Sequence, residues 1–224
     1  MRTDMVGGAP GRLRSFDPAR VADLEFRAWV GYYRRDWPGV LRASVGLVRA
    51  GFGMDWVQTL HGAWLVLRAN HLWAPADNDP DGARRCMRRF YGLLKLSYGE
   101  PGDVTEAARL EVDWWRVHRE RQYAGQPGTG QPDTGQPDAG QPGTGQPIAG
   151  GPADELVAAL TRLYTFLYDE PEAAVRPAAV YRTEAMDLSD QWVAEGCRPD
   201  SPLLARERAA LVRSYAALLA AVHH

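Results

Sequence analysis

Apolar residues recur along most of the chain at the three- and four-residue spacing that is typical of amphipathic helices. In the segment that follows Pro80, for example, one apolar stripe consists of Ala83, Met87, Phe90 and Leu94. No segment shows the sustained two-residue alternation of a half-buried strand. The pattern therefore predicts an all-α fold, a single bundle of about six to eight helices.

Capping residues and helix breakers predict where these helices begin and end. Asp17-Pro18 and Asp79-Pro80 each combine a capping side chain with a proline that suits the first helical turn. The expected helices cover residues 17–37, 38–49, 54–73, a segment beginning at Pro80, and residues 103–123, 154–168, 176–195 and 202–222. Since the 54–73 segment is apolar nearly all round, we expect it at the centre of the bundle.

The middle of the chain is occupied by five copies of a five-residue unit, GQPGT GQPDT GQPDA GQPGT GQPIA, at residues 125–149. Such a polar segment, rich in proline and glycine, cannot bury enough apolar surface to fold, so we expect disorder. A long flexible loop adds little closure entropy and can lie within one domain. We therefore expect a flexible tail (1–16), a first helical part (17–124), a disordered linker (125–151) and a second helical part (152–224).

Composition narrows the class of protein and its partners. The formal net charge of -2 gives no sign of nucleic-acid binding. Neither a signal peptide nor a run of about eighteen apolar residues occurs, so we expect a cytoplasmic protein without a membrane partner. Cys86 and Cys197 are too few for a disulfide framework or a thiolate metal motif. A small molecule or a protein remains as the partner, and homo-oligomers are compatible with the sequence.

Ionisable residues on apolar helix faces are the main candidates for chemistry, because a buried charge must be paired, hydrogen-bonded or bound to a metal. On the first helix, Glu25 and Asp36 fall opposite the charged stripe. In the 103–123 segment, Glu111 and His118 lie opposite the charged face. These two residues are two turns apart, so they point the same way about 10 Å from each other along the helix axis.

Two other segments contribute inward polar residues. His61 and Arg68 share one stripe of the 54–73 helix, and His71 lies to one side of it. Because Arg68 cannot lose its charge, it needs a carboxylate partner. In the 176–195 segment, Arg182 falls among apolar neighbours and Glu184 lies at the border of the apolar face.

Three hypotheses account for these residues. The first is a structural network, which would include Asp36, Arg68, His71 and Arg182 and would fix how the helices pack. The second is a metal site of helical-bundle type, whose ligands would be Glu25, Glu111, His118 and either His61 or Glu184. The third is a small-molecule pocket lined by some of the eight tryptophans and nine tyrosines.

The Glu111-x6-His118 pair on an inward helix face resembles one element of the haem-oxygenase-like di-iron oxidases. The resemblance implies oxidation of a small molecule by iron or manganese bound to carboxylate and imidazole. It also implies a further glutamate and a later helix with histidine and aspartate ligands, yet residues 184–190 contain acidic residues and no histidine. Ferritin-like proteins fit less well, since Trp114 stands where their Glu-x-x-His motif requires a histidine.

A separate candidate is the arginine-rich stripe RRCMRR, which consists of Arg84, Arg85, Arg88 and Arg89 and has no acidic residue among its outward positions. Clustered guanidinium groups bind phosphate and carboxylate well, so the stripe predicts an anionic ligand or an acidic partner. The alternative is an ordinary solvated helix face.

Overall fold

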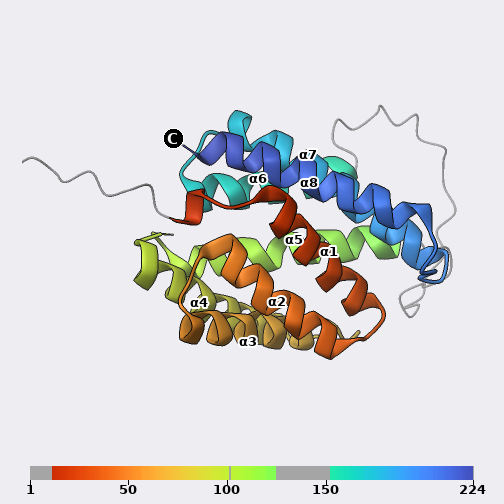
Figure 1. The fold of residues 1–224 in the computed structure, drawn as a ribbon, viewed down its shortest axis with the longest axis horizontal. Helices are drawn as coiled ribbons and strands as arrows, with labels where there is room; N and C mark the ends of the chain where they lie inside the picture. Colours follow the sequence, from red (N-terminus) through yellow and green to blue (C-terminus); the bar gives the residue numbers. More distant parts are fainter. Residues whose placement is uncertain (1–11, 101, 125–151, 224) are drawn as a thin grey trace, which may run out of the picture.

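The computed structural model describes residues 12–100, 102–124 and 152–223, which form eight α-helices, one short 3-10 helix and no strand (Figure 1). This confirms the predicted all-α bundle. The elements are η1 (Arg12–Arg14), α1 (Pro18–Tyr33), α2 (Trp37–Phe52), α3 (Trp56–Trp73), α4 (Pro80–Tyr98), α5 (Val104–Ala124), α6 (Pro152–Tyr168), α7 (Glu172–Ala194) and α8 (Pro202–Val222). The predicted disorder at 125–151 and residues 1–11 of the predicted tail lie outside the described residues.

Aspartate side chains cap the N-termini of the first four α-helices. Asp17 accepts hydrogen bonds from the backbone of Ala19 and Arg20 at the start of α1, and Asp79 accepts one from Gly82 at the start of α4. Each cap satisfies backbone N–H groups that have no partner within the helix. The Asp-Pro pairs at residues 17–18 and 79–80 therefore mark helix starts, as predicted.

The helices pack in chain order and close into a ring. Each of α1 to α7 packs against the next helix, and α8 returns to pack against α1. In Figure 1, α3 and α4 lie on one side of the molecule, α7 and α8 lie on the other, and α5 lies between them. Because α5 packs against α6, the helices before and after the 125–151 segment belong to the same bundle.

The position of α3 differs from the prediction that residues 54–73 form the central helix. This helix lies on the outside, where it packs against α2 and α4 (Figure 1). One face carries Thr59, Ala63 and Ala69 into the core, whereas the opposite face leaves Trp64 56% exposed. The helix is apolar nearly all round because both faces are apolar, not because both are buried.

The described end of the N-terminal segment is held against the bundle. Leu13 is buried, and the Arg14 guanidinium donates a hydrogen bond of 2.8 Å to Glu170. Residues 12–16 therefore depart from the flexible tail that we predicted. Within the described ranges, no helix combines the length and apolar character that crossing a membrane requires.

Candidate functional site

A cavity of about 980 Å³, partly open to solvent, lies between the helices of the bundle and is lined by residues of α1 to α8. Its wall is mainly aliphatic and aromatic, and its aromatic side chains include Trp29, Trp114, Trp115, Tyr164 and Tyr168. Several charged and polar side chains interrupt this wall. Size and composition are both typical of small-molecule sites, in which a few polar groups are set into an apolar enclosure.

The first polar group in the cavity wall is an ion pair between α1 and α7. Arg182 donates a hydrogen bond to Glu25, which is 4% exposed. The Tyr215 hydroxyl donates a second hydrogen bond to Glu25 at 2.6 Å. The Arg182 guanidinium also lies over the rings of Trp29 and Trp114, at 5.8 and 5.5 Å from their centroids. Both charges are therefore satisfied inside the protein, as buried charges must be.

The second polar group is the carboxyl of Glu111 on α5. It accepts hydrogen bonds from the Tyr91 hydroxyl at 2.8 Å and from the Trp115 indole at 3.2 Å. Burial raises the pKa of Glu111, whereas the Tyr91 hydrogen bond and the charge of Arg182 lower it. Glu111 forms no ion pair with the described residues. Since a carboxylate offers about four lone pairs, it keeps acceptor capacity toward the cavity.

The third polar group links the C-terminal part of α5 to α7. The His118 Nε2 atom lies 3.2 Å from Asp190 Oδ2, and Gln122 donates hydrogen bonds to Asp190 and to the Tyr33 hydroxyl. A histidine that is oriented by a carboxylate is a common general acid or base in proteins. This cluster is therefore the part of the cavity wall best suited to proton transfer.

The structure does not bring the predicted metal ligands together. His61 is exposed, and the exposed Glu184 pairs with Arg213 at 2.6 Å. Glu25, Glu111 and His118 all line the cavity, but each is hydrogen-bonded to different partners. Among the described residues, no three or more His, Cys, Asp and Glu side chains are grouped so that they could hold a metal ion.

A positive charge also occupies the place beside Glu25. The Arg182 guanidinium already provides the cation that this carboxylate requires. A metal ion at the same carboxylate would face that guanidinium at close range, where like charges repel strongly in a low-dielectric interior. The donor set therefore does not fit the iron or manganese pair that the sequence suggested.

Three residues of the predicted inward network lie at the surface. Asp36 is exposed and caps α2 by accepting a hydrogen bond of 3.0 Å from the Gly39 backbone. The helical projection misplaced it because α1 ends at Tyr33. Arg68 and His71 are exposed because α3 turns the opposite face toward the core. Only Arg182 of the predicted network lies in the cavity wall.

The sequence prediction missed several residues of the cavity wall. On α5, Glu111, Trp115, His118 and Gln122 recur at spacings of four, three and four residues, and all line the cavity. This spacing marks one helix face, so Gln122 could have been predicted. The partners Tyr33, Tyr91, Asp190 and Tyr215 come from other helices. Their pairing depends on how the helices pack and has no signal in one sequence.

A buried carboxyl that the sequence analysis did not consider lies outside this wall, on α8. Glu207 is 0% exposed, and neither of its oxygens has a hydrogen-bond partner among the described residues. Burial, together with the negative charges of Glu25 and Asp190, raises the pKa of Glu207 to about 8. Glu207 lies on the same face of α8 as the buried Leu203, Leu211 and Ser214, and this helical spacing is visible in the sequence.

The arginine stripe of α4 borders a surface groove of about 540 Å³, which is lined by Arg84, Arg85, Arg88 and, on α5, Thr105 and Arg109. Acidic residues do lie beside it, contrary to the premise of the prediction. Arg84 pairs with Asp81 at 2.9 Å and Arg85 pairs with Asp79 at 3.5 Å, because the first turn of α4 reaches the stripe. Arg88 and Arg89 are exposed and form no ion pair with the described residues.

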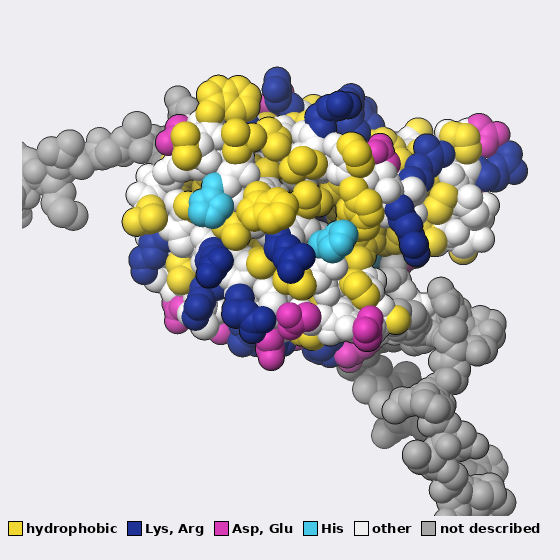
Figure 2. All heavy atoms as spheres, turned by 90° about the horizontal axis from the view of Figure 1, so that it is seen from below, with side chains coloured by type: hydrophobic (Ala, Val, Ile, Leu, Met, Phe, Trp, Pro, Cys, Tyr) yellow, Lys and Arg dark blue, Asp and Glu magenta, His cyan; other side chains and the backbone are white. Residues whose placement is uncertain are grey.

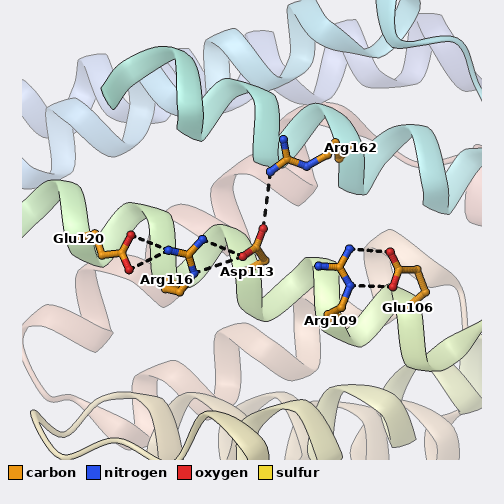
Figure 3. A network of polar contacts seen from close by, with 6 residues as sticks. All are labelled: Glu106, Arg109, Asp113, Arg116, Glu120 and Arg162. Atoms are coloured by element: carbon orange, nitrogen blue, oxygen red, sulfur yellow. Dashed lines mark hydrogen bonds and ion pairs between the residues drawn. The ribbon is translucent and has the colours of Figure 1, made fainter. Parts of the chain in front are cut away.

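Charges on the neighbouring α5 surface compensate one another (Figure 3). Arg109 forms two hydrogen bonds of 2.7 Å with Glu106. Arg116 pairs with Asp113 at 3.0 Å and with Glu120 at 2.6 Å, and Arg162 of α6 reaches Asp113 at 3.6 Å. Such exposed pairs contribute little stability individually. Because these pairs leave few unpaired cations, the surface is less suited to binding an anion than the sequence suggested.

The chain matches no protein-family model, and no curated protein or solved structure is significantly similar to it. The geometry of the cavity and the chemistry of its wall are therefore the basis for proposing a function.

Proposed function

We propose that this protein binds a small molecule inside the cavity, and that the ligand has an apolar body and at least one hydrogen-bond donor. The observation that carries the proposal is the cavity of about 980 Å³ whose apolar wall includes Glu25, Glu111 and Asp190. Its volume lies at the upper end of the range for ligand sites, about 300–1,000 Å³. A ligand would fill the space and offer partners to the polar groups.

Two physical costs favour a ligand over a purely structural interior. Protein cores are close-packed, so a space of this size between the helices leaves many side chains without the packing contacts that a ligand would supply. Carboxylates inside the fold add a desolvation penalty, which apolar residues of similar volume would avoid. A site that binds a ligand explains why the chain retains both features.

The free acceptor capacity of Glu111 indicates how the ligand is oriented. Arg182 already has Glu25 as its counter-ion, so it has little need of an anionic ligand. Glu111 accepts hydrogen bonds from Tyr91 and Trp115 and has no ion-pair partner among the described residues. A hydroxyl or amine of the ligand would donate to Glu111, and its apolar body would pack on Trp114 and Trp115.

Metal-dependent oxidation, the function that the sequence resemblance implied, stays a prediction. The ligand set that it requires is not assembled among the described residues. Binding of a small molecule needs no further residue, and the His118–Asp190 pair could add proton transfer to binding. The cavity therefore supports ligand binding more directly than it supports catalysis.

A cavity-filling variant tests the proposal. Ala28 lines the cavity, so Ala28→Trp should occupy part of it, whereas Ala216→Trp on the exposed surface of α8 is the matched control. We would screen hydroxylated and amine-bearing aromatic compounds by thermal unfolding of the full chain. A ligand at about 100 times its Kd adds about 2.7 kcal/mol, which raises Tm by about 5 °C or more for a chain of this size.

The variants separate the cavity from the rest of the surface. Compounds that bind in the cavity should raise Tm in the native chain and in Ala216→Trp but not in Ala28→Trp. Glu111→Gln should weaken their binding about tenfold or more, because it removes the charge that strengthens the acceptor. Equal Tm shifts in Ala28→Trp and the native chain would refute the proposal.

A further inference from the structure

The outer face of α3 carries an exposed apolar stripe. Trp56, Val57, Leu60 and Trp64 are 59%, 79%, 56% and 56% exposed, and we call these four residues the α3 stripe. They lie at the spacing that places side chains along one side of a helix. Single exposed apolar residues are ordinary, but a continuous group with two tryptophans marks an interaction surface.

Arginines border the α3 stripe on both sides. Toward α2, the Arg49 guanidinium lies over the Trp56 ring, 4.1 Å from its centroid. On the side of α4, Arg68 follows Trp64 by about one helical turn of α3, and Arg89 lies on α4, which packs against α3. Burial and the charge of Asp79 raise the pKa of Cys86 on α4, whereas the charges of Arg68, Arg89 and Arg85 lower it, which indicates that Arg68 and Arg89 act on the same part of the surface. Basic side chains of α2, α3 and α4 therefore belong to the same face as the stripe.

These basic groups are largely uncompensated. Arg68 and Arg89 are exposed and form no ion pair in the part of the chain that the structure describes. Asp55, at the start of α3, is used as the helix cap and accepts a hydrogen bond of 2.8 Å from the Gln58 backbone. The surface is thus locally basic although the whole chain has a net charge of -2.

Figure 2 views the molecule from the side on which α2, α3 and α4 lie. Hydrophobic side chains gather at the centre of this face, basic side chains and histidines lie among and around them, and acidic side chains gather along one edge. A partner with apolar residues between acidic ones would match this surface in both charge and polarity.

We propose that the α3 stripe and its basic border dock an acidic amphipathic helix of a partner protein. The apolar face of such a helix would cover Trp56, Leu60 and Trp64, and its flanking carboxylates would pair with the free arginines. A second copy of this chain fits less well, because a two-fold contact would place each basic border against its own kind. The proposal is independent of the cavity and its ligand.

Two designed helical peptides test this proposal with the full-length chain. Both peptides carry leucines along one face, and they differ only in flanking residues, which are all glutamate in one and all lysine in the other. Fluorescence anisotropy of the labelled peptides gives their affinities. We expect the glutamate peptide to bind at least about tenfold more tightly than the lysine peptide, a difference that shrinks as salt is added.

Matched variants locate the bound peptide. Trp64→Ser and the double charge reversal Arg68→Glu, Arg89→Glu should each weaken the glutamate peptide about tenfold or more, because they remove the apolar anchor or the charge partners. Val180→Ser and Arg206→Glu, exposed on α7 and α8, are the controls and should have no effect. All five substituted positions are exposed, so the fold should survive, which circular dichroism checks.

Three results would overturn the proposal. The first is equal affinity for the two peptides, and the second is unchanged binding by Trp64→Ser. The third is evidence that the stripe is covered by something other than an acidic helix. A chain dimer that sedimentation detects and Trp64→Ser dissociates would assign the stripe to self-association. Binding to anionic vesicles that the glutamate peptide does not displace would assign it to a lipid surface.

Discussion

The buried carboxyl of Glu207 predicts a pH dependence of stability that can be worked out from the structure. Glu207 is fully buried without a hydrogen-bond partner among the described residues, and its pKa rises from the ordinary 4.5 to about 8. Below pH 4.5 the group is protonated in both the folded and the unfolded state. Above that pH only the unfolded chain releases the proton readily, so folding becomes less favourable as pH rises.

The magnitude follows from this difference in pKa. At 1.36 kcal/mol for each pKa unit, the group should cost the folded state about 1 kcal/mol at pH 5 and about 3 kcal/mol at pH 7. Glu207→Gln removes the titration and keeps the shape of the side chain. The stability gained by the substitution should therefore grow by about 2 to 3 kcal/mol between about pH 5 and pH 7.

Urea unfolding, followed by circular dichroism at several pH values, measures this difference directly. Other groups titrate in both proteins, so the difference between native chain and variant isolates Glu207. Ala216→Gln, at an exposed position of the same helix without a titratable side chain, is the control and should leave the pH dependence unchanged. A gain that stays constant with pH would show that Glu207 is not the buried, unpaired acid that the structure describes.

Three further predictions concern the ion pairs and the metal. Arg182→Met should destabilise the fold by about 3–5 kcal/mol in urea unfolding, because it leaves the Glu25 charge buried and unpaired. Adding Glu25→Gln to the same chain should restore much of this loss. Arg116→Ala should cost less than about 1 kcal/mol, since its ion pairs are exposed, and a cost that survives high salt would contradict this. Elemental analysis after anaerobic addition of iron or manganese should show no stoichiometric metal, and metal lost on Glu111→Ala or His118→Ala would instead support an oxidase.

Much of the fold could be predicted from the sequence because helices are specified locally. Aspartate caps before α1 and α4, and apolar spacing within each helix, place all eight α-helices close to their observed positions. The order of packing could not be predicted in the same way. An apolar surface all round α3 is compatible with a central helix and with an outer helix that has an exposed face, and the structure shows the second.

The candidate site was predictable only in part. Glu25, Glu111 and His118 were found because each interrupts an apolar helix face. Their roles depend on residues of other helices, such as the Arg182 that pairs with Glu25 and the Asp190 that orients His118. Helical spacing shows which way a side chain points but not what it meets. A shared inward direction therefore suggested a shared metal, where the structure has three separate hydrogen-bonded groups.

The central claim is that the cavity holds a small molecule, and native mass spectrometry of the gently purified chain tests it most directly. We predict about one bound small molecule per chain, within the stoichiometry of a single site. The bound molecule should remain in Ala216→Trp and be absent from Ala28→Trp. Its occupancy should be lower in Glu111→Gln. Equal occupancy of the native chain and Ala28→Trp, or no bound mass in any preparation, would contradict the proposed function.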